Sequence, residues 1–302
     1  AYIKGLLSES DATARENFYK NAMRLYGEAK SGETYADAAL ELGHFYLNQK
    51  QYQNAIDYFS RVPAEDLRYP EAAFYTGLIH WQQQNYEQGL AVLRPLADDL
   101  QLTSVYNTLG AIAVQASRAE KKNKQKSAAL LNEGLQHLKK ASESAPDDVQ
   151  SRFNYGVALF LNNSFTEAAQ NLRPVLATKP TDGEAYFVLA KTLEKLSDAS
   201  AADFDNQARR FLPTYAKYET DWTKTKTLEI PVRLEQPPRK DFVSVVLIKR
   251  RNVPVQTAVS ETETLLAQAK GFYKAGRDED AMQVLRRILA SEPMSAEAYL
   301  LL

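Results

Sequence analysis

Apolar and polar positions follow a helical spacing through most of the chain. Between Ala38 and Val62, apolar residues fall three or four positions apart in two short stretches, which a polar break at 48–52 separates. This spacing predicts two amphipathic helices joined by a tight turn, because one face of each helix is then apolar. Gly43 lies midway along the first stretch and Ala55 midway along the second.

The same pattern returns at a fixed interval. Gly43 and Gly77 are 34 residues apart, and Gly156 and Ala190 are again 34 residues apart. An interval near 34 is typical of stacked helix–turn–helix repeats, in which each helix pair packs on its neighbours. Glycine inside a helix costs about 1 kcal/mol relative to alanine. We therefore expect the two helices of a pair to approach closely at Gly43 and Gly77, where a side chain would clash.

The repeat pattern divides the chain into three regions. Residues 1–222 predict an array of about five units, of which the first, third and fifth are irregular. In the fifth unit, Ala208, Leu212 and Tyr215 are predicted to lie in one helix, the second of the pair. Residues 223–261 interrupt the pattern with four prolines, which predicts an irregular linker or cap. Residues 262–302 resume the pattern as a further unit, the start of a second array. Because the first residue is not Met and the last residues begin another repeat, we expect the chain to be a piece of a longer protein.

Two irregular segments have patterns of their own. The third unit exceeds the period by 12 residues around the basic stretch 117–126, which predicts longer helices. Such a charge run is more often a solvated helix face than an anion-binding site.

In the linker, apolar residues occupy every second position from 228 to 234, which predicts an extended chain. The pattern of residues 241–251 fits either a strand or a helix, and we favour a short helix that begins at Asp241.

The composition excludes several classes of function. The formal charge of −1, from 37 basic and 38 acidic residues, gives no overall field that would draw the chain to nucleic acid or to an anionic membrane. The longest apolar runs have about seven residues, whereas a transmembrane helix needs roughly 20. Cysteine is absent, which excludes disulfides, thiol chemistry and cysteine-ligated metal.

No group of residues predicts chemistry. His44, His80 and His137 fall in different predicted helices and have no partner at metal-ligand spacing. A phosphate-binding loop, an HExxH motif and a serine elbow are all missing from the sequence. The acidic pairs 98–99 and 147–148 lie near predicted helix ends, where capping is the simpler role. We expect no catalytic residue, no metal site and no cofactor, so the segment is predicted not to be an enzyme.

The repeat residues occur in matching sets. They are Leu42, Gly43, Tyr46, Ala55, Phe59 and Val62; Gly77, Gly89, Leu93 and Leu96; Tyr155, Gly156, Leu159, Ala168, Leu172, Val175 and Pro180; and Ala269, Ala281, Leu285, Ile288 and Pro293. In residue type, turn length and period these sets resemble the tetratricopeptide repeat family. The resemblance implies an all-α fold, a right-handed α-solenoid of stacked antiparallel helix pairs, here with an irregular insert before the last repeat. It also implies a concave groove that the first helix of each pair lines.

The resemblance also implies a set of groove residues and a class of partner. The positions that line the groove in the family correspond here to His44, Leu47, Asn48, Phe74, Leu78, Trp81, Gln82, Asn107, Phe153, Val157 and Phe160. Their apolar and aromatic character suits a protein or peptide partner with an amphipathic helix or an apolar extended segment. One subgroup of the family grips chaperone C-terminal tails with a Lys/Asn/Arg cluster. That cluster is replaced here by His44, Leu78, Ala111 and Val157, which argues against a chaperone tail.

The sequence leaves several alternatives open. Trp81 suits either the groove or the core, because tryptophan is highly buried on average but rarely fully so. Besides a binding scaffold, the chain suits a self-assembling module, which its open ends would allow, or a regulatory segment of a larger multidomain protein. A nucleic-acid or membrane-surface binder through the basic stretches 118–126 and 249–251 is the least favoured, and we expect no specific nucleic acid partner. The interruption at 223–260 is a cap, a hinge or a segment that lies in the chain's own groove.

Overall fold

The computed structural model describes residues 11–29, 35–252, 261–274 and 277–291, and every regular element in these ranges is an α-helix. Residues 1–247 and 248–302 belong to two compact units. The helices are α2 (Ala12–Ala29), α3 (Ala36–Asn48), α4 (Tyr52–Phe59), α5 (Tyr69–Gln82), α6 (Tyr86–Leu100), α7 (Thr103–Ala119), α8 (Lys124–Ser144), α9 (Val149–Leu161), α10 (Phe165–Thr178), α11 (Gly183–Lys195), α12 (Ala201–Phe211), α13 (Tyr215–Thr225), α14 (Arg239–Asn252), α15 (Glu261–Lys274) and α16 (Asp278–Ser291).

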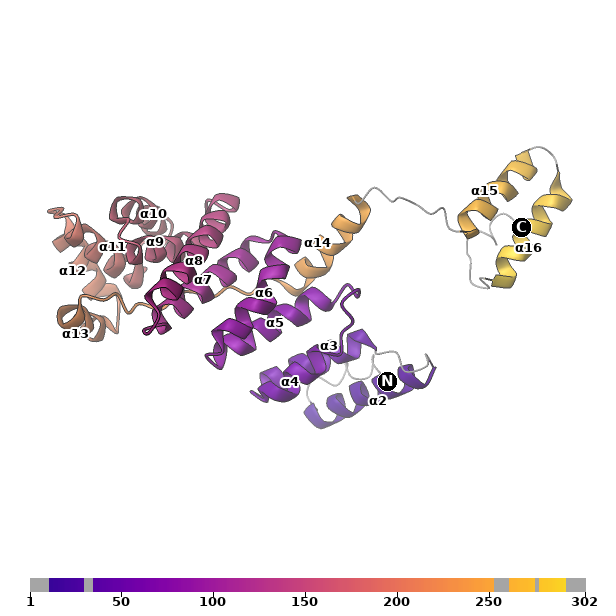
Figure 1. Ribbon diagram of the computed structural model, residues 1–302, viewed down its shortest axis with the longest axis horizontal. Coiled ribbons are helices and arrows are strands. Elements are labelled where there is room, and N and C mark those ends of the chain that lie inside the picture. Colours follow the sequence, from indigo (N-terminus) through magenta and orange to yellow (C-terminus); the bar gives the residue numbers. More distant parts are fainter. Residues whose placement is uncertain (1–10, 30–34, 253–260, 275–276, 292–302) are drawn as a thin grey trace. The chain divides into compact units, whose positions relative to one another are not determined.

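The first unit is a stack of helix pairs (Figure 1). Its pairs are α3/α4, α5/α6, α7/α8, α9/α10 and α11/α12, and each pair packs on the next. Buried side chains form a core that continues from one pair to the following pair. The predicted all-α solenoid is therefore confirmed. Within the described residues, no helix is both long and apolar enough to cross a membrane.

The turns after α3, α5, α9 and α11 share one conformation. Lys50, Gln84, Asn163 and Ser197 follow the ends of α3, α5, α9 and α11, and each has a positive φ between 57° and 62°. In each turn the next amide donates a hydrogen bond to the carbonyl five residues earlier, as in the 2.9 Å bond from Gln51 to Tyr46. These bonds satisfy carbonyls that a helix end leaves free. The polar break in the sequence pattern therefore marks a repeated helix-ending motif.

The two helices of a pair meet at the glycines. A Cβ atom added to Gly43 would lie 2.3 Å from a ring carbon of Phe59, and one added to Gly156 would lie 2.7 Å from Cγ of Leu172. Real Cβ atoms do not approach other atoms so closely, so any side chain at these positions would push the helices apart. The close approach predicted from the glycine spacing is confirmed.

The irregular units differ from the regular ones in specific ways. The longer third unit consists of 17 residues in α7 and 21 in α8, so its extra residues extend the helices as predicted. In the fifth unit the sequence pattern placed Leu212 and Tyr215 in one helix with Ala208, and that was wrong. Helix α12 ends at Phe211, and Leu212 has an extended backbone with ψ of 102°. Pro213 is the cause, because a residue before proline disfavours the helical conformation.

The interruption after α13 packs against the first unit. We call residues 226–238, which are not helical, the strap. The strap leads from α13 to α14, and the compact unit continues through Leu247. Leu228 and Ile230 are 2% and 0% exposed, whereas Glu229 between them and Pro231 after Ile230 are exposed, so the alternation predicts which side is buried. Helix α14 confirms the favoured helix, although it begins at Arg239, two residues before Asp241.

The second unit contains the helix pair α15/α16, where the repeat pattern resumes. Its small core consists of Leu266, Ala269, Leu285 and Ile288. The last of the repeat residues predicted there, Pro293, lies outside the described residues, as do the two ends of the chain.

Close helix packing at Gly43 gives a first testable prediction. Replacing Gly43 with Ala should lower the free energy of unfolding of the first unit by about 1–3 kcal/mol, because the clash with the buried Phe59 ring outweighs the gain in helix propensity. Gly271→Ala is the matched control: nothing lies within 4 Å of its added Cβ, so it should stabilise α15 by up to about 1 kcal/mol. Hydrogen exchange in increasing urea follows each unit separately, and an unchanged first unit in the Gly43 variant would contradict the packing account.

Candidate functional site

The strap lies along the first helices of successive pairs. Its contacts come from α7, α9 and α11, and α14 continues the path to α5 and α3. Figure 1 shows the strap passing from α13 beneath α9 and α7 to α14. These are the helices that were predicted to line a groove, and we call their shared surface the first-helix face.

Polar side chains on the first-helix face bind the main chain of the strap. Asn154 in α9 accepts a 2.8 Å hydrogen bond from the amide of Arg233 and donates a 2.5 Å bond to its carbonyl oxygen. Thr108 in α7 donates a 2.7 Å bond to the carbonyl of Glu235. Every peptide has these amide and carbonyl groups, so these contacts hold an open chain whatever its side chains.

Arg118 near the end of α7 binds the beginning of the strap. Its Nη1 and Nη2 atoms donate to the carbonyl oxygens of Ile230 and Leu228, at 2.7 and 3.1 Å. Burial lowers the pKa of the Arg118 guanidinium, and the charge of Glu229 opposes that shift. A buried cation is costly unless it is compensated, so the two carbonyl groups of the strap stabilise the position of Arg118.

Apolar side chains of the strap complete the core of the array. Leu228, Ile230 and Val232 belong to the same buried cluster as Val157 of α9 and Trp222 of α13. Burial of one such side chain contributes about 1.5–3 kcal/mol relative to an exposed position. The strap therefore packs like a core element on one side and is exposed on the other.

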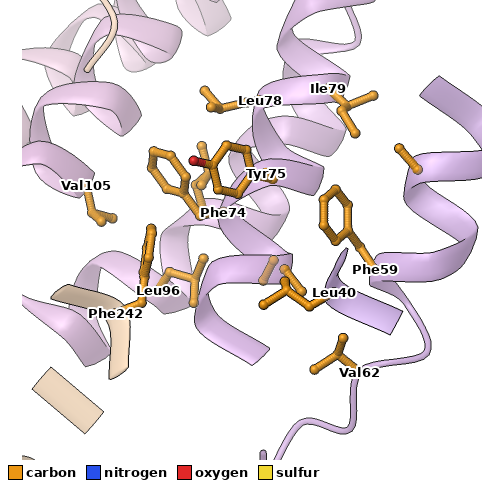
Figure 2. Close-up of a cluster of buried hydrophobic side chains, with 14 of the residues drawn as sticks. Leu40, Phe59, Val62, Phe74, Tyr75, Leu78, Ile79, Leu96, Val105 and Phe242 are labelled. Atoms are coloured by element: carbon orange, nitrogen blue, oxygen red, sulfur yellow. The ribbon is translucent and has the colours of Figure 1, made fainter. Parts of the chain in front are cut away.

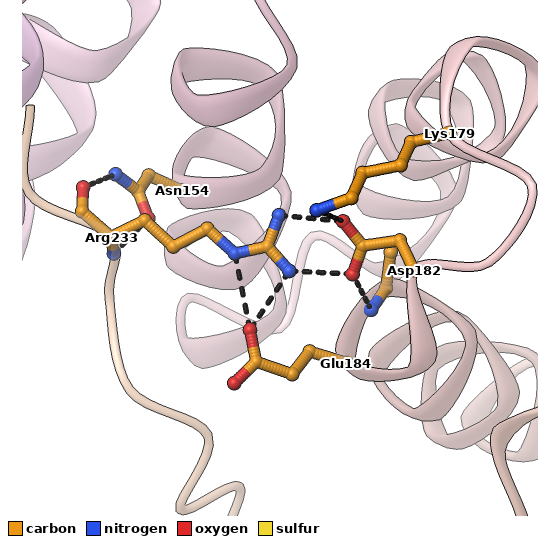
Figure 3. Close-up of polar contacts among 6 residues, drawn as sticks. Asn154, Lys179, Asp182, Glu184 and Arg233 are labelled. Atoms are coloured by element: carbon orange, nitrogen blue, oxygen red, sulfur yellow. Dashed lines mark hydrogen bonds and ion pairs between the residues drawn. The ribbon is translucent and has the colours of Figure 1, made fainter. Parts of the chain in front are cut away.

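Arg233 is the most completely bound side chain of the strap. Its Nη1 and Nη2 atoms donate to the two carboxylate oxygens of Asp182 at 2.9 and 2.6 Å, and Nε and Nη2 donate to one oxygen of Glu184 at 3.1 and 2.8 Å. Figure 3 shows the guanidinium between the two carboxylates. The same group lies 3.5 Å above the ring centroid of Phe153. Paired hydrogen bonds and a cation–π contact thus act on one group.

Asp182 is held in place by the start of α11. Its carboxylate accepts a 3.1 Å hydrogen bond from the amide of Ala185, which caps the helix. Gly183 allows this helix start to lie against the end of α12, since an added Cβ would lie 2.6 Å from main-chain atoms there. Burial alone would raise the pKa of Asp182, but the hydrogen bonds and charge of Arg233 hold that pKa below its ordinary value.

Helix α14 fixes the other end of the strap. Phe242 is fully buried, and its ring centroid lies 5.4 Å from that of Phe74 in α5 (Figure 2). Arg239 donates to Glu41 of α3 at 2.7 Å and also pairs with Glu71 of α5. The strap is therefore anchored by α13 at one end and by these contacts at the other.

The sequence-predicted site residues divide into two groups. One group lies beside the strap and its flanking helices: Phe74 contacts Phe242, Asn107 donates to Glu235 at 3.4 Å, Phe153 lies under Arg233, Val157 shares the buried cluster of the strap, and Phe160 contacts Trp222. The other group lies elsewhere: His44 is 2.7 Å from Glu71, Trp81 donates to Gln115 at 2.7 Å, Leu78 is buried, Leu47 is half-buried, and Asn48 and Gln82 are exposed. Their role in binding stays a prediction.

The first-helix face is hollow beyond the point where Arg239 binds. A cavity of about 360 Å³ there is lined by Arg15, Glu41, His44, Asn48, Tyr75 and Arg239. It includes His44 and Asn48 from the predicted set. This part of the face is not covered by the strap.

Several residues that hold the strap were not predicted. They are Thr108, Arg118, Asn154, Asp182 and Glu184. The repeat spacing could have indicated some of these residues. Glu41, Thr108 and Asn154 each lie two residues before the glycine of their repeat. In the structure, Thr108 and Asn154 bind the strap and Glu41 binds Arg239. No such spacing singles out Arg118 or Asp182.

The remaining titratable candidates have structural roles. Burial lowers the pKa of both His80 and His137, which fits neutral packed rings. Asp148 caps α9 through the amides of Gln150 and Ser151, as predicted. The capping role predicted for the pair 98–99 was wrong, because both residues lie inside the last turn of α6. Lys126 of the basic stretch pairs with Glu87, so its charge is matched by a neighbouring repeat.

Comparison with known proteins agrees with the repeat geometry. Tetratricopeptide repeat models match residues 40–98 and 128–182, and another tetratricopeptide repeat model matches 263–295. The chain is a tetratricopeptide repeat protein. The matched ranges include the helix pair α9/α10 and most of the pairs α5/α6 and α15/α16.

Solved structures of other tetratricopeptide repeat proteins share this fold. YrrB, whose structure is described as a TPR protein with an unusual peptide-binding site, is 14% identical with a TM-score of 0.54; the match covers 67% of this chain and 97% of YrrB. A crystal structure of MamA is 15% identical with a TM-score of 0.50, covering 60% of this chain and 93% of MamA. At this identity the likeness concerns the fold alone. No curated protein sequence gives a significant match.

The contacts of Asn154 predict how the strap loosens. Asn154→Ala should speed amide exchange of Arg233 by about tenfold or more, because the amide of Arg233 loses its acceptor and its carbonyl loses a donor. Asn162→Ala, which removes an exposed side chain on the same helix pair, is the matched control and should leave this rate unchanged. Equal protection of Arg233 in both variants would contradict main-chain binding by Asn154.

The lowered pKa of Asp182 predicts a pH dependence. Its pairing with Arg233 stabilises the fold above the ordinary aspartate pKa of about 4, and this contribution is lost as the pH falls through the lowered pKa. In Arg233→Ala the burial of Asp182 remains without its partner, so that pKa should rise. Urea unfolding of both proteins should show a difference in the free energy of unfolding that is largest above about pH 5. The difference should shrink below about pH 4, the ordinary pKa of aspartate. A difference that is constant with pH would refute this linkage.

Proposed function

We propose that residues 1–247 form a non-enzymatic protein-interaction scaffold whose first-helix face takes an extended peptide from a partner protein. The observation that carries the proposal is the binding of main-chain groups by Thr108, Arg118 and Asn154. Side chains placed to bind amides and carbonyls in an open chain are suited to peptide recognition, since they need no particular sequence. The tetratricopeptide repeat family and the description of YrrB as a peptide-binding member support the same class of function.

The strap shows the chemistry that such a peptide needs. Apolar side chains at alternate positions face the array, as Leu228, Ile230 and Val232 do, and an extended backbone reaches Arg118 at one end and Thr108 at the other. An apolar extended segment is one of the two partner types expected from the aromatic first-helix face. The strap provides no support for the other type, an amphipathic helix.

The strap also sets the affinity that a partner peptide needs in order to bind. A tethered segment acts at an effective concentration of the order of millimolar, so a free peptide binds only if it outcompetes the strap or if the strap is first released. The strap connects directly to α14 and then to residues 248–302, so its release could be controlled from that side of the chain. In this proposal the scaffold is closed until a partner or a change in the strap opens it.

A labelled peptide tests this function in the full chain. Ile230→Asp places a charge at a fully buried position and should detach the strap, while circular dichroism shows that the helices persist. A fluorescein-labelled peptide with the sequence of residues 226–238 should then bind at least about tenfold more tightly than it binds the wild-type chain, whose own strap competes.

The matched control is Gln236→Asp, which adds the same charge at an exposed position of the strap and should bind the peptide no better than wild type. If the detached variant keeps its helices but does not bind the peptide, the first-helix face is not a peptide site and the strap is only a structural element.

A further inference from the structure

Arg233 occupies a pocket that is built for a guanidinium. The pocket consists of the carboxylates of Asp182 and Glu184 and the ring of Phe153, and it engages three nitrogens of the guanidinium through four hydrogen bonds. Only 14% of the Arg233 side chain is exposed. Figure 3 shows that the carboxylates reach Arg233 from the start of α11, whereas the strap approaches from the side of α9.

The geometry favours arginine over lysine. Nη1 and Nη2 match the two oxygens of Asp182 as a planar fork, Nε and Nη2 share one oxygen of Glu184, and Cζ lies 3.5 Å above the ring centroid of Phe153. An ammonium group can contact two carboxylates, as Lys191 contacts Asp205 and Glu219. Its single nitrogen cannot, however, form the paired parallel hydrogen bonds to both oxygens of Asp182, and it has no plane to lay on a ring. Replacing Arg233 with lysine is therefore not a conservative substitution.

The pocket is set by the array and not by the strap. Phe153 is fully buried within α9, and Asp182 is fixed by capping α11. Asp182 is itself 4% exposed, so without a cation it would be a buried carboxylate with few compensating groups. Lys179, 3.7 Å away and largely exposed, supplies a weaker contact. A preformed acidic pocket of this kind attracts a guanidinium from any extended chain that the face holds.

We propose that this pocket is a specificity site for arginine, and that the partner peptide presents an arginine to Asp182 and Glu184 in the place of Arg233. This inference rests on the proposed function, since it adds a side-chain requirement to the main-chain binding described there. The partner is then an extended segment with buried apolar residues at alternate positions, like Leu228, Ile230 and Val232. An arginine directly follows the last of these residues, as Arg233 follows Val232.

Four peptides distinguish this inference from general peptide binding. They share the sequence of residues 226–238 but carry arginine, lysine, citrulline or alanine at position 233, and fluorescence anisotropy measures their binding to the full chain with Ile230→Asp. The arginine peptide should bind at least about tenfold more tightly than each of the others, including citrulline, which keeps the shape but not the charge. Glu184→Gln in the same chain should narrow the difference between arginine and lysine peptides.

A peptide with Gln236→Ala is the control, because Gln236 is exposed, and it should bind like the arginine peptide. If all four peptides bind within about twofold of one another, the face binds extended chains but the pocket does not select arginine. If none binds, the proposed function fails and this inference fails with it.

A second measurement needs no detached strap and covers the case in which Ile230→Asp does not fold. Amide exchange of residues 228–235 is compared in the wild-type chain, Arg233→Lys and Arg233→Ala. The lysine variant should expose the strap to about the same extent as the alanine variant, because an ammonium cannot form the paired hydrogen bonds that hold the guanidinium. Protection in Arg233→Lys equal to that of wild type would overturn the selectivity for arginine.

Discussion

The hydrogen bonds between Asn154 and the main chain of Arg233 join two parts of the chain that are 79 residues apart. On one side lies a repeat array that is built from local helix pairs, and on the other lies the strap, which has no regular structure of its own. The array leaves a face of first helices with polar groups and apolar side chains. The strap satisfies both, because its main chain meets the polar groups and its alternate side chains enter the core. Arg118, which burial would otherwise destabilise, depends on the same arrangement.

The strap gives the face two properties that a bare array would not have. Its apolar residues are part of the buried cluster, so removing it exposes core side chains of α9 such as Val157. Its tether keeps it at a high effective concentration, so under the proposed function it competes with any free peptide. A scaffold of this kind is occupied by default. The cavity near His44 and Asn48 is a part of the first-helix face that the strap leaves uncovered.

The sequence predicts the parts of the fold that repeat. The interval of 34 residues follows from local helix pairs, and the glycines mark contacts such as that of Gly43 with Phe59. The alternation from 228 to 234 correctly predicts an open chain with one buried side, because burial at every second residue is a local property. The helix end before Pro213 was missed, although the proline was visible, because apolar spacing continued across it.

The candidate site is predicted less completely. Residues such as Phe74 and Phe153 follow from the repeat positions of the family, yet whether they face a partner or the strap depends on a contact between distant segments. The register of the strap decides that Asn154 meets Arg233 and that Thr108 meets Glu235, and no local pattern contains that register. Asp182 also has a sufficient local role as a helix cap, which hides its second role as a partner of Arg233.

Amide hydrogen exchange of the unmodified chain tests the central claim most directly, namely that the strap is seated on the first helices. Arg233 donates its amide to a buried Asn154, so its amide should exchange as slowly as the amides in the middle of α9, even though the strap has no helical hydrogen bonds. Exchange of residues 228–235 at the rate of an unstructured peptide would show that the strap does not occupy this face.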